Sequence, residues 1–206
     1  MSRTLFRIPK MFTEQEMTRI DPRLPDDYHQ RFKEFWDYVE ERLYGARHKI
    51  RKIYLESTGV TGKRQLDMLE MSNPRQHGIV KTLLDSGSEL VQAEDPELVL
   101  ETMSWMQKMQ EMISSGITED GSSKIPTIGE FLQESMKERN DFVARRVDET
   151  LGDEEVGVLF MDMSRELDLK RDIRMITVCP FRPLDYLNSW LAGLRARKGT
   201  SVEEEE

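Results

Sequence analysis

The segment that most constrains the fold is residues 156–161, an apolar run without a single charge. A short continuous apolar run is typical of a strand covered on both faces, as in the parallel sheets of α/β proteins. Further strand patterns occur at residues 4–8, 50–56, 89–93 and 173–178, and amphipathic helix patterns separate most of them. This alternation predicts an α/β fold with a mainly parallel central sheet flanked by helices.

Helix patterns are found at six places: residues 28–47, 63–71, 75–84, 96–113, 127–151 and 183–195. The region between about 95 and 130 is expected to be a helical insertion, with a flexible loop at residues 118–123. The polar stretch after Pro9, which contains Pro22 and Pro25, is expected to connect the first strand to the first helix. We expect a single α/β domain over residues 1–197 and an acidic disordered tail over residues 198–206.

Composition excludes several classes of function. The 206 residues carry 39 Asp and Glu against 30 Lys and Arg, and this acidic balance argues against a nucleic-acid partner. A single cysteine excludes an intramolecular disulfide and any multi-cysteine metal site. No apolar run approaches the roughly 20 residues that cross a bilayer, and the N-terminus lacks a secretory signal pattern. We therefore expect a cytoplasmic protein with no membrane partner.

Polar residues at the strand ends mark a candidate site, because ligands of parallel α/β sheets bind beyond the carboxyl ends of the strands. Glu56 ends one predicted strand, and Asp162 follows another. Arg139 lies on the apolar stripe of the long helix, where a charge must be paired, and Glu56 or Asp162 could supply the carboxylate. These residues form either a structural ion pair or the lining of a polar pocket.

Two segments resemble one known superfamily. Residues 52–56 (KIYLE), a strand ending in glutamate, resemble the second strand of the superfamily that contains TraB, Tiki, erythromycin esterase and ChaN-like proteins. Residues 138–146 (ERNDFVARR) resemble its Glu-Arg-Asp helix motif, and the apolar strand follows at the expected distance. The order of elements agrees from residue 4 to about 178. Small uncharacterised prokaryotic members are most similar, since they share the segments EDPEL at 94–98 and PLDYL at 183–187.

The superfamily's mark is a pair of Gly-x-x-His motifs, associated in its hydrolases with a catalytic centre that is metal-dependent in the Tiki-like members. Here residues 9–12 are PKMF and residues 162–165 are DMSR, so both histidines and both glycines are missing. Phe12 cannot bind a metal and Arg165 would repel one. The remaining candidates for ligand binding are Glu56, Arg139, Asp162 and Arg165, and we expect neither a metal nor a cofactor.

Other chemically interesting residues favour structural roles. The histidines His29, His48 and His77 have no ligand spacing, and Cys179 is expected to be a small buried side chain. Four methionines recur every third residue, at positions 103, 106, 109 and 112. They are expected to fill irregular contacts between helices, or else to form an adaptable apolar surface for a partner or an apolar ligand.

Three functions remain open. The first is a catalytically degenerate TraB/Tiki/ChaN-like protein that binds a small ligand or a protein partner and is not an enzyme. The second is an active hydrolase, metal-dependent or carboxylate-based, that uses Glu56 and Asp162. The third is a partner-binding module, a homodimer included, that works through the methionine-rich helix or the loop at 118–123.

Overall fold

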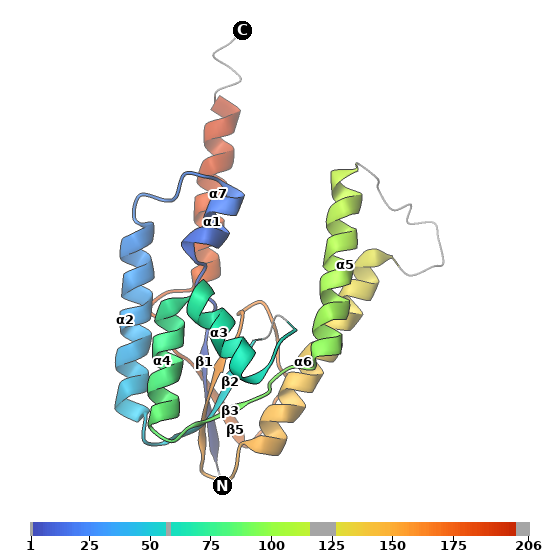
Figure 1. Cartoon of the computed structure of the whole chain (residues 1–206). Coiled ribbons are helices and arrows are strands. Elements are labelled where there is room, and N and C mark those ends of the chain that lie inside the picture. Colours follow the sequence, from blue (N-terminus) through green and yellow to red (C-terminus); the bar gives the residue numbers. More distant parts are fainter. Residues whose placement is uncertain (1, 57–58, 116–126, 201–206) are drawn as a thin grey trace.

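The computed structural model describes residues 2–56, 59–115 and 127–200, with the backbone alone for 197–200. Its strands form one sheet in the order β3-β2-β4-β1-β5, and every pair is parallel, which confirms the expected α/β fold (Figure 1). The strands are β1 Arg3–Ile8, β2 Ile50–Leu55, β3 Glu89–Val91, β4 Val156–Phe160 and β5 Ile173–Thr177. The helices are α1 Glu14–Ile20, α2 Tyr28–Ala46, α3 Gly62–Ser72, α4 Pro74–Asp85, α5 Pro96–Ser114, α6 Ile128–Thr150 and α7 Pro183–Thr200.

Strand β4 lies at the centre of the sheet, between β2 and β1, which explains its unbroken apolar sequence. Its side chains alternate between two cores, as the period of a strand requires. Val158 and Phe160 belong to the core under α2 and α4, whereas Leu159 belongs to the core under α6. Because both faces of β4 are covered, a charged side chain within the strand would have no access to water.

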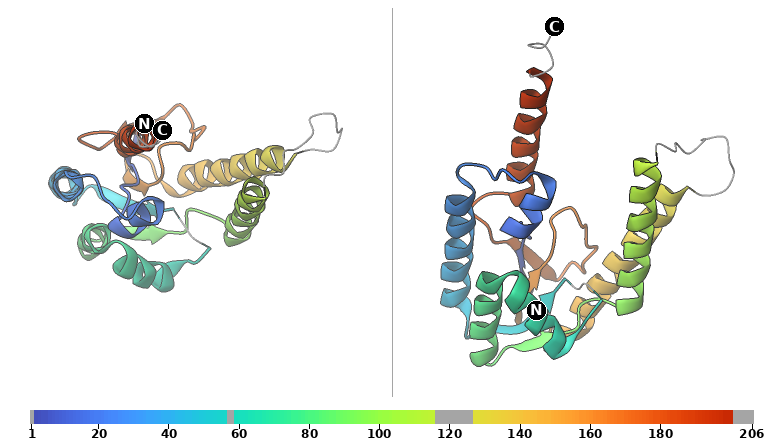
Figure 2. Two further views of the ribbon diagram at one scale, coloured as in Figure 1. Left: turned by 90° about the horizontal axis from the view of Figure 1, so that it is seen from above. Right: turned by 45° about the horizontal axis from the view of Figure 1, so that its top comes forward.

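The expected helical insertion is an arm made of α5 and the first half of α6. The two helices lie side by side and project from the sheet (Figure 1), and both views of Figure 2 show the arm standing apart from α1 and α3. The rings of Trp105 and Phe131 stack with centroids 4.7 Å apart, and the buried hydroxyls of Thr102 and Ser135 lie 2.7 Å apart. The predicted loop at 118–123 lies outside the described residues.

Helix α1 was not expected, because the polar stretch after Pro9 was interpreted as a connection. It begins with a capping box, in which the Thr13 hydroxyl accepts from the Glu16 backbone N–H and the Glu16 carboxylate accepts from the Thr13 backbone N–H. Met17 is its one buried residue, and it packs with Tyr28 of α2 and Leu187 of α7. A helix with a single buried residue shows no apolar periodicity, so the sequence pattern of this segment did not indicate a helix.

The C-terminal helix is longer than expected. Helix α7 continues to Thr200, whereas the sequence pattern predicted an end at residue 195 and a tail from residue 198. Residues 201–206, which make up most of the predicted tail, lie outside the described part of the chain. Among the described helices, none has the length and apolar character to cross a membrane.

Candidate functional site

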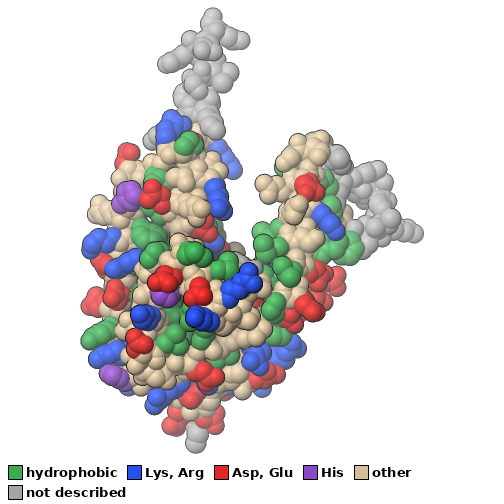
Figure 3. All heavy atoms as spheres, in the orientation of Figure 1, with side chains coloured by type: hydrophobic (Ala, Val, Ile, Leu, Met, Phe, Trp, Pro, Cys, Tyr) green, Lys and Arg blue, Asp and Glu red, His purple; other side chains and the backbone are tan. Residues whose placement is uncertain are grey.

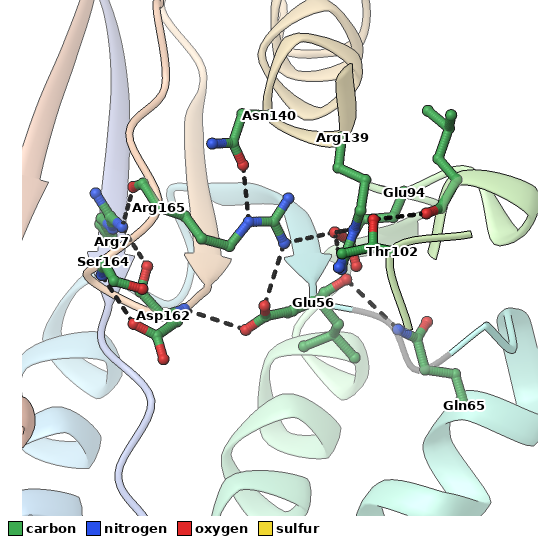
Figure 4. Close-up of polar contacts among 12 residues, drawn as sticks. Arg7, Glu56, Gln65, Glu94, Thr102, Arg139, Asn140, Asp162, Ser164 and Arg165 are labelled. Carbon is green, nitrogen blue, oxygen red and sulfur yellow. Dashed lines mark hydrogen bonds and ion pairs between the residues drawn. The ribbon is translucent and has the colours of Figure 1, made fainter. Parts of the chain in front are cut away.

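The candidate residues meet at the carboxyl edge of the sheet (Figure 4). Glu56 follows β2, Asp162 and Arg165 follow β4, and Arg139 projects from α6 toward them. Two further charged residues join this group, Glu94 three residues after the end of β3 and Arg7 near the end of β1. We call these residues the ion-pair network: Arg7, Glu56, Glu94, Arg139, Asp162 and Arg165.

Glu94 is the centre of the network. Its side chain is 1% exposed, and its Oε1 accepts hydrogen bonds from Nε and Nη2 of Arg139 at 3.2 and 2.7 Å and from Nη1 of Arg165 at 2.5 Å. The expectation that Glu56 or Asp162 pairs with Arg139 was therefore wrong. Helix α5 begins just after Glu94 and packs along α6, and this packing brings Glu94 to Arg139.

Arg165 connects two strand ends. Its Nη1 lies 2.5 Å from Glu94 Oε1 and 3.1 Å from Glu56 Oε1, and its Nε donates to Asn140 Oδ1 at 2.8 Å. The side chain is 2% exposed, so both ion pairs are shielded from water on the arginine side. Its Nη2 is buried without a hydrogen-bond partner among the described residues. Two carboxylates from neighbouring strands thus share one cationic nitrogen.

Asp162 takes part mainly through its backbone. Its N–H donates to Glu56 Oε2 at 3.1 Å, and its Oδ1 accepts from the Ser164 N–H at 2.8 Å. Arg7 Nη2 donates to the carbonyls of Asp162 and Arg165, which ties down the segment after β4. Burial lowers the pKa of Arg7, although the nearby Asp162 charge acts in the opposite direction. The contact between Glu56 and Asp162 is thus from backbone to carboxylate.

The charges of the ion-pair network are balanced, and most of its side chains are buried. Its three arginines and three acids sum to zero charge. The side-chain exposure is 8% for Arg139 but 28% for Glu56, so Glu56 is the member that solvent reaches most readily among the ion pairs around Glu94. The two interpretations made from the sequence each apply to a part of the site. Glu94, Arg139 and Arg165 form a structural ion-pair core. Glu56 is paired with this core through Arg165 and is itself partly exposed.

A cleft of about 620 Å³ lies above Glu56, between the strand ends and helices α1, α3 and α5. Glu56 and Arg139 line its floor together with apolar residues at the strand ends, Ile8, Leu55, Phe160 and Met161. Further apolar side chains line its walls: Val60, Met68, Leu69, Val99, Met103 and Met106. Figure 3 shows hydrophobic side chains gathered along the side of the arm that faces the rest of the molecule. The volume is in the range of small-molecule sites.

The rim of the cleft on α1 carries an ion pair between Lys10 and Glu16, whose Nζ and Oε1 are 2.7 Å apart. Burial lowers the pKa of Lys10, but its hydrogen bond and attraction to Glu16 more than compensate, so its pKa is raised overall. Lys10 therefore stays cationic at neutral pH. Arg19 also borders the cleft.

The side chains at the strand ends do not fit the metal centre that the superfamily resemblance implies. Phe12 packs in the cluster of Met17 and Tyr28, away from the network. Arg165 places a cationic nitrogen between Glu56 and Glu94, where it repels a second cation. In the described part of the chain, no three His, Cys, Asp or Glu side chains are arranged to hold a metal ion.

None of the hydrogen bonds and ion pairs found among the described residues joins the other residues singled out in the sequence to the ion-pair network. His29 and His48 are exposed, and burial raises the pKa of the half-buried Cys179. Met103 and Met106 are exposed into the cleft, whereas Met109 and Met112 are half-buried in the arm. The methionine-rich helix thus has some methionines packed in the arm and others exposed along the cleft.

Comparison with known proteins adds no assignment, because no family model, no curated protein and no solved structure matches the chain. The resemblance to TraB, Tiki and ChaN-like proteins therefore stays a prediction.

Proposed function

We propose that this chain is a ligand-binding protein, a divergent TraB/Tiki/ChaN-like member in which ion pairs stand in place of a hydrolytic centre. The observation that carries the proposal is the position of Arg165 Nη1, within 3.1 Å of Glu56 and 2.5 Å of Glu94. Carboxylates held by a guanidinium are stable ion-pair partners and poor metal ligands. The strand-end acids therefore build a rigid floor and leave the cleft above them for a ligand.

The buried part of the network is also unsuited to general acid–base catalysis. A general base must lie within hydrogen-bond reach of the substrate, and Glu94 is 1% exposed with three arginine donors on one oxygen. Neither Glu94 nor Arg165 lines the cleft. Among the acids around Arg165, Glu56 is the one that a ligand can reach from the cleft.

Metal analysis of the purified full-length chain, together with a screen for peptidase and esterase turnover, tests the proposal. We expect substoichiometric transition metal and no turnover above a control preparation. Stoichiometric bound metal together with hydrolysis would overturn it. Arg165→Met serves as a matched variant, since loss of the guanidinium frees the two carboxylates and should raise divalent-cation affinity relative to the wild type.

An active hydrolase based on Glu56 and Asp162 is the second candidate. It is favoured by the 28% exposure of the Glu56 side chain and by its place on the cleft floor. The Glu56→Gln variant keeps the shape and removes the charge, so hydrolysis that depends on this carboxylate must fall sharply in it. If any detected activity is unchanged in Glu56→Gln, this candidate is excluded.

A partner-binding role of the arm is the third candidate. It is favoured by large apolar side chains that are exposed on α5, among them Leu100 at 58% and Ile113 at 68%. Size-exclusion chromatography with light scattering tests for a homodimer of the full chain. A mass that stays monomeric over a wide concentration range would exclude self-association through this surface.

A further inference from the structure

The cleft has a wall of exposed methionines beside a floor in which Glu56 and Arg139 lie among apolar strand-end residues. Met68, Met103 and Met106 line it and are 37%, 48% and 54% exposed. Large apolar side chains are exposed in this way singly on many surfaces, but these three come from two helices and border the same space. Methionine is flexible and polarizable, so such a wall adapts to an apolar chain of varied shape.

The floor limits the charge of what can bind there. The ion-pair network below it is neutral in sum, the Lys10–Glu16 pair on the rim is neutral as well, and Arg19 adds one positive charge at the rim. An anionic head would meet the like charge of Glu56 in the same cleft. A cationic head would meet the like charges of Arg139, Lys10 and Arg19. A head that carries both signs can pair its cation with Glu56 and its anion with Arg139 or Lys10, which line the same cleft.

The hydrogen-bonding groups of the cleft narrow the chemical class of the ligand further. Glu56 offers acceptor oxygens only, so it favours a cation that carries N–H groups over a quaternary ammonium, which has none to donate. Arg139 and Lys10 are donors, which suit a carboxylate. The charged part of the cleft thus suits the polar head of a ligand, and the apolar wall suits the apolar chain of the same molecule.

We propose that the cleft binds a zwitterionic amphiphile of the amino-carboxylate type. Its ammonium group contacts Glu56, its carboxylate faces Arg139 or Lys10, and its apolar chain lies along the wall formed by Met68, Met103 and Met106. This inference rests on the proposed function, that the cleft is a ligand site, and adds the chemical class of the ligand.

Isothermal titration calorimetry of the full chain with four single-chain probes, each below its micelle-forming concentration, tests the class. The probes are 2-aminododecanoic acid, dodecanoic acid, dodecylamine and dodecylphosphocholine, which share an alkyl chain and differ in the head. We expect 2-aminododecanoic acid to bind more tightly than the other three by about tenfold or more. Equal binding of all four would show that the floor does not select the head, and would overturn the proposal.

Variants place the binding in the cleft. Glu56→Gln should weaken the affinity for 2-aminododecanoic acid by about tenfold. Met103→Asp should weaken this affinity as well, because it places a charge in the apolar wall. Met71→Asp is the matched control, since Met71 is a 78% exposed methionine of α3 that does not line the cleft. Should Glu56→Gln fail to fold, Met103→Asp still tests the site, because Met103 is exposed. Binding that Met103→Asp leaves intact would refute the assignment to the cleft.

The outcomes separate this inference from the proposed function. If dodecanoic acid or dodecylamine binds best and Met103→Asp abolishes that binding, the cleft is a ligand site of another class, and only the inference fails. If none of the four probes binds, the inference also fails, and the proposed function is then decided by the metal and hydrolase measurements.

Discussion

Replacing Glu94 with glutamine removes one negative charge from the most buried point of the ion-pair network while keeping the size of the side chain. Glu94 Oε1 accepts three hydrogen bonds from two arginines, and both arginines are at most 8% exposed. In Glu94→Gln these guanidiniums stay in place but lose their shared counter-charge. The amide can still accept a hydrogen bond, so the main loss is electrostatic.

The expected loss follows from the burial of the partners. Breaking a buried ion pair from one side costs about 3–5 kcal/mol in the free energy of unfolding, because the remaining charge is left uncompensated. For a chain of this size that corresponds to a melting temperature lower by about 6–20 °C. Glu56→Gln should cost only about 1 kcal/mol, since its side chain is 28% exposed and solvent screens the charge.

Urea denaturation followed by circular dichroism measures these differences, provided the m-value is unchanged between variants. Glu89→Gln is the control, because its ion pair with Lys52 is on the surface, with Glu89 68% exposed, and should contribute no more than about 0.5 kcal/mol. The charge-balanced double variant Glu94→Gln/Arg139→Met should lose less than the sum of the two single variants. A loss below about 1 kcal/mol for Glu94→Gln would refute the view that this network is a buried ion-pair core.

Three further outcomes are expected. Gly157→Ala should lower the free energy of unfolding by about 1–3 kcal/mol in urea denaturation, because a Cβ there would lie 3.1 Å from two core side chains; a neutral effect would contradict the tight packing of β4. Thr13→Ala removes the side chain that caps α1 and should cost about 1 kcal/mol in the same assay, whereas Thr13→Ser should restore most of it. Hydrogen bonds from Lys170 and Arg3 lower the pKa of Asp148, so its stabilisation is complete above the unfolded value of about 3.9 and is lost as the pH falls below it. Asp148→Asn should therefore show a flatter acid limb of stability against pH, and an unchanged limb would exclude this ion pair as its cause.

The sheet could be predicted from the sequence because burial leaves a clear pattern. The run at residues 156–161 has no charge since β4 is covered on both faces, and the neighbouring strand patterns are confirmed within two residues at each end. Helix α1 was missed because it buries only Met17. Its capping box was nevertheless present in the sequence, as Thr13 followed three residues later by Glu16.

The pairing within the site could be predicted only in part. That Arg139 needs a carboxylate follows from its place on an apolar stripe, and the structure pairs it with a buried acid. Which acid it contacts depends on the order of the strands and on the path of α5, and neither can be derived from one sequence. Glu94 directly follows the predicted strand at 89–93, much as Glu56 ends the one at 50–56, so the same argument applied to it, but Glu94 was not among the candidate residues.

Anomalous diffraction from crystals of the full chain soaked in manganese chloride tests the central claim most directly. We expect Arg165 to remain in contact with both Glu56 and Glu94, as its 3.1 and 2.5 Å distances indicate, and no anomalous peak to lie between the two carboxylates. A manganese ion bound by Glu56 and Glu94, with the Arg165 side chain displaced, would contradict the account and restore the case for a hydrolytic metal centre.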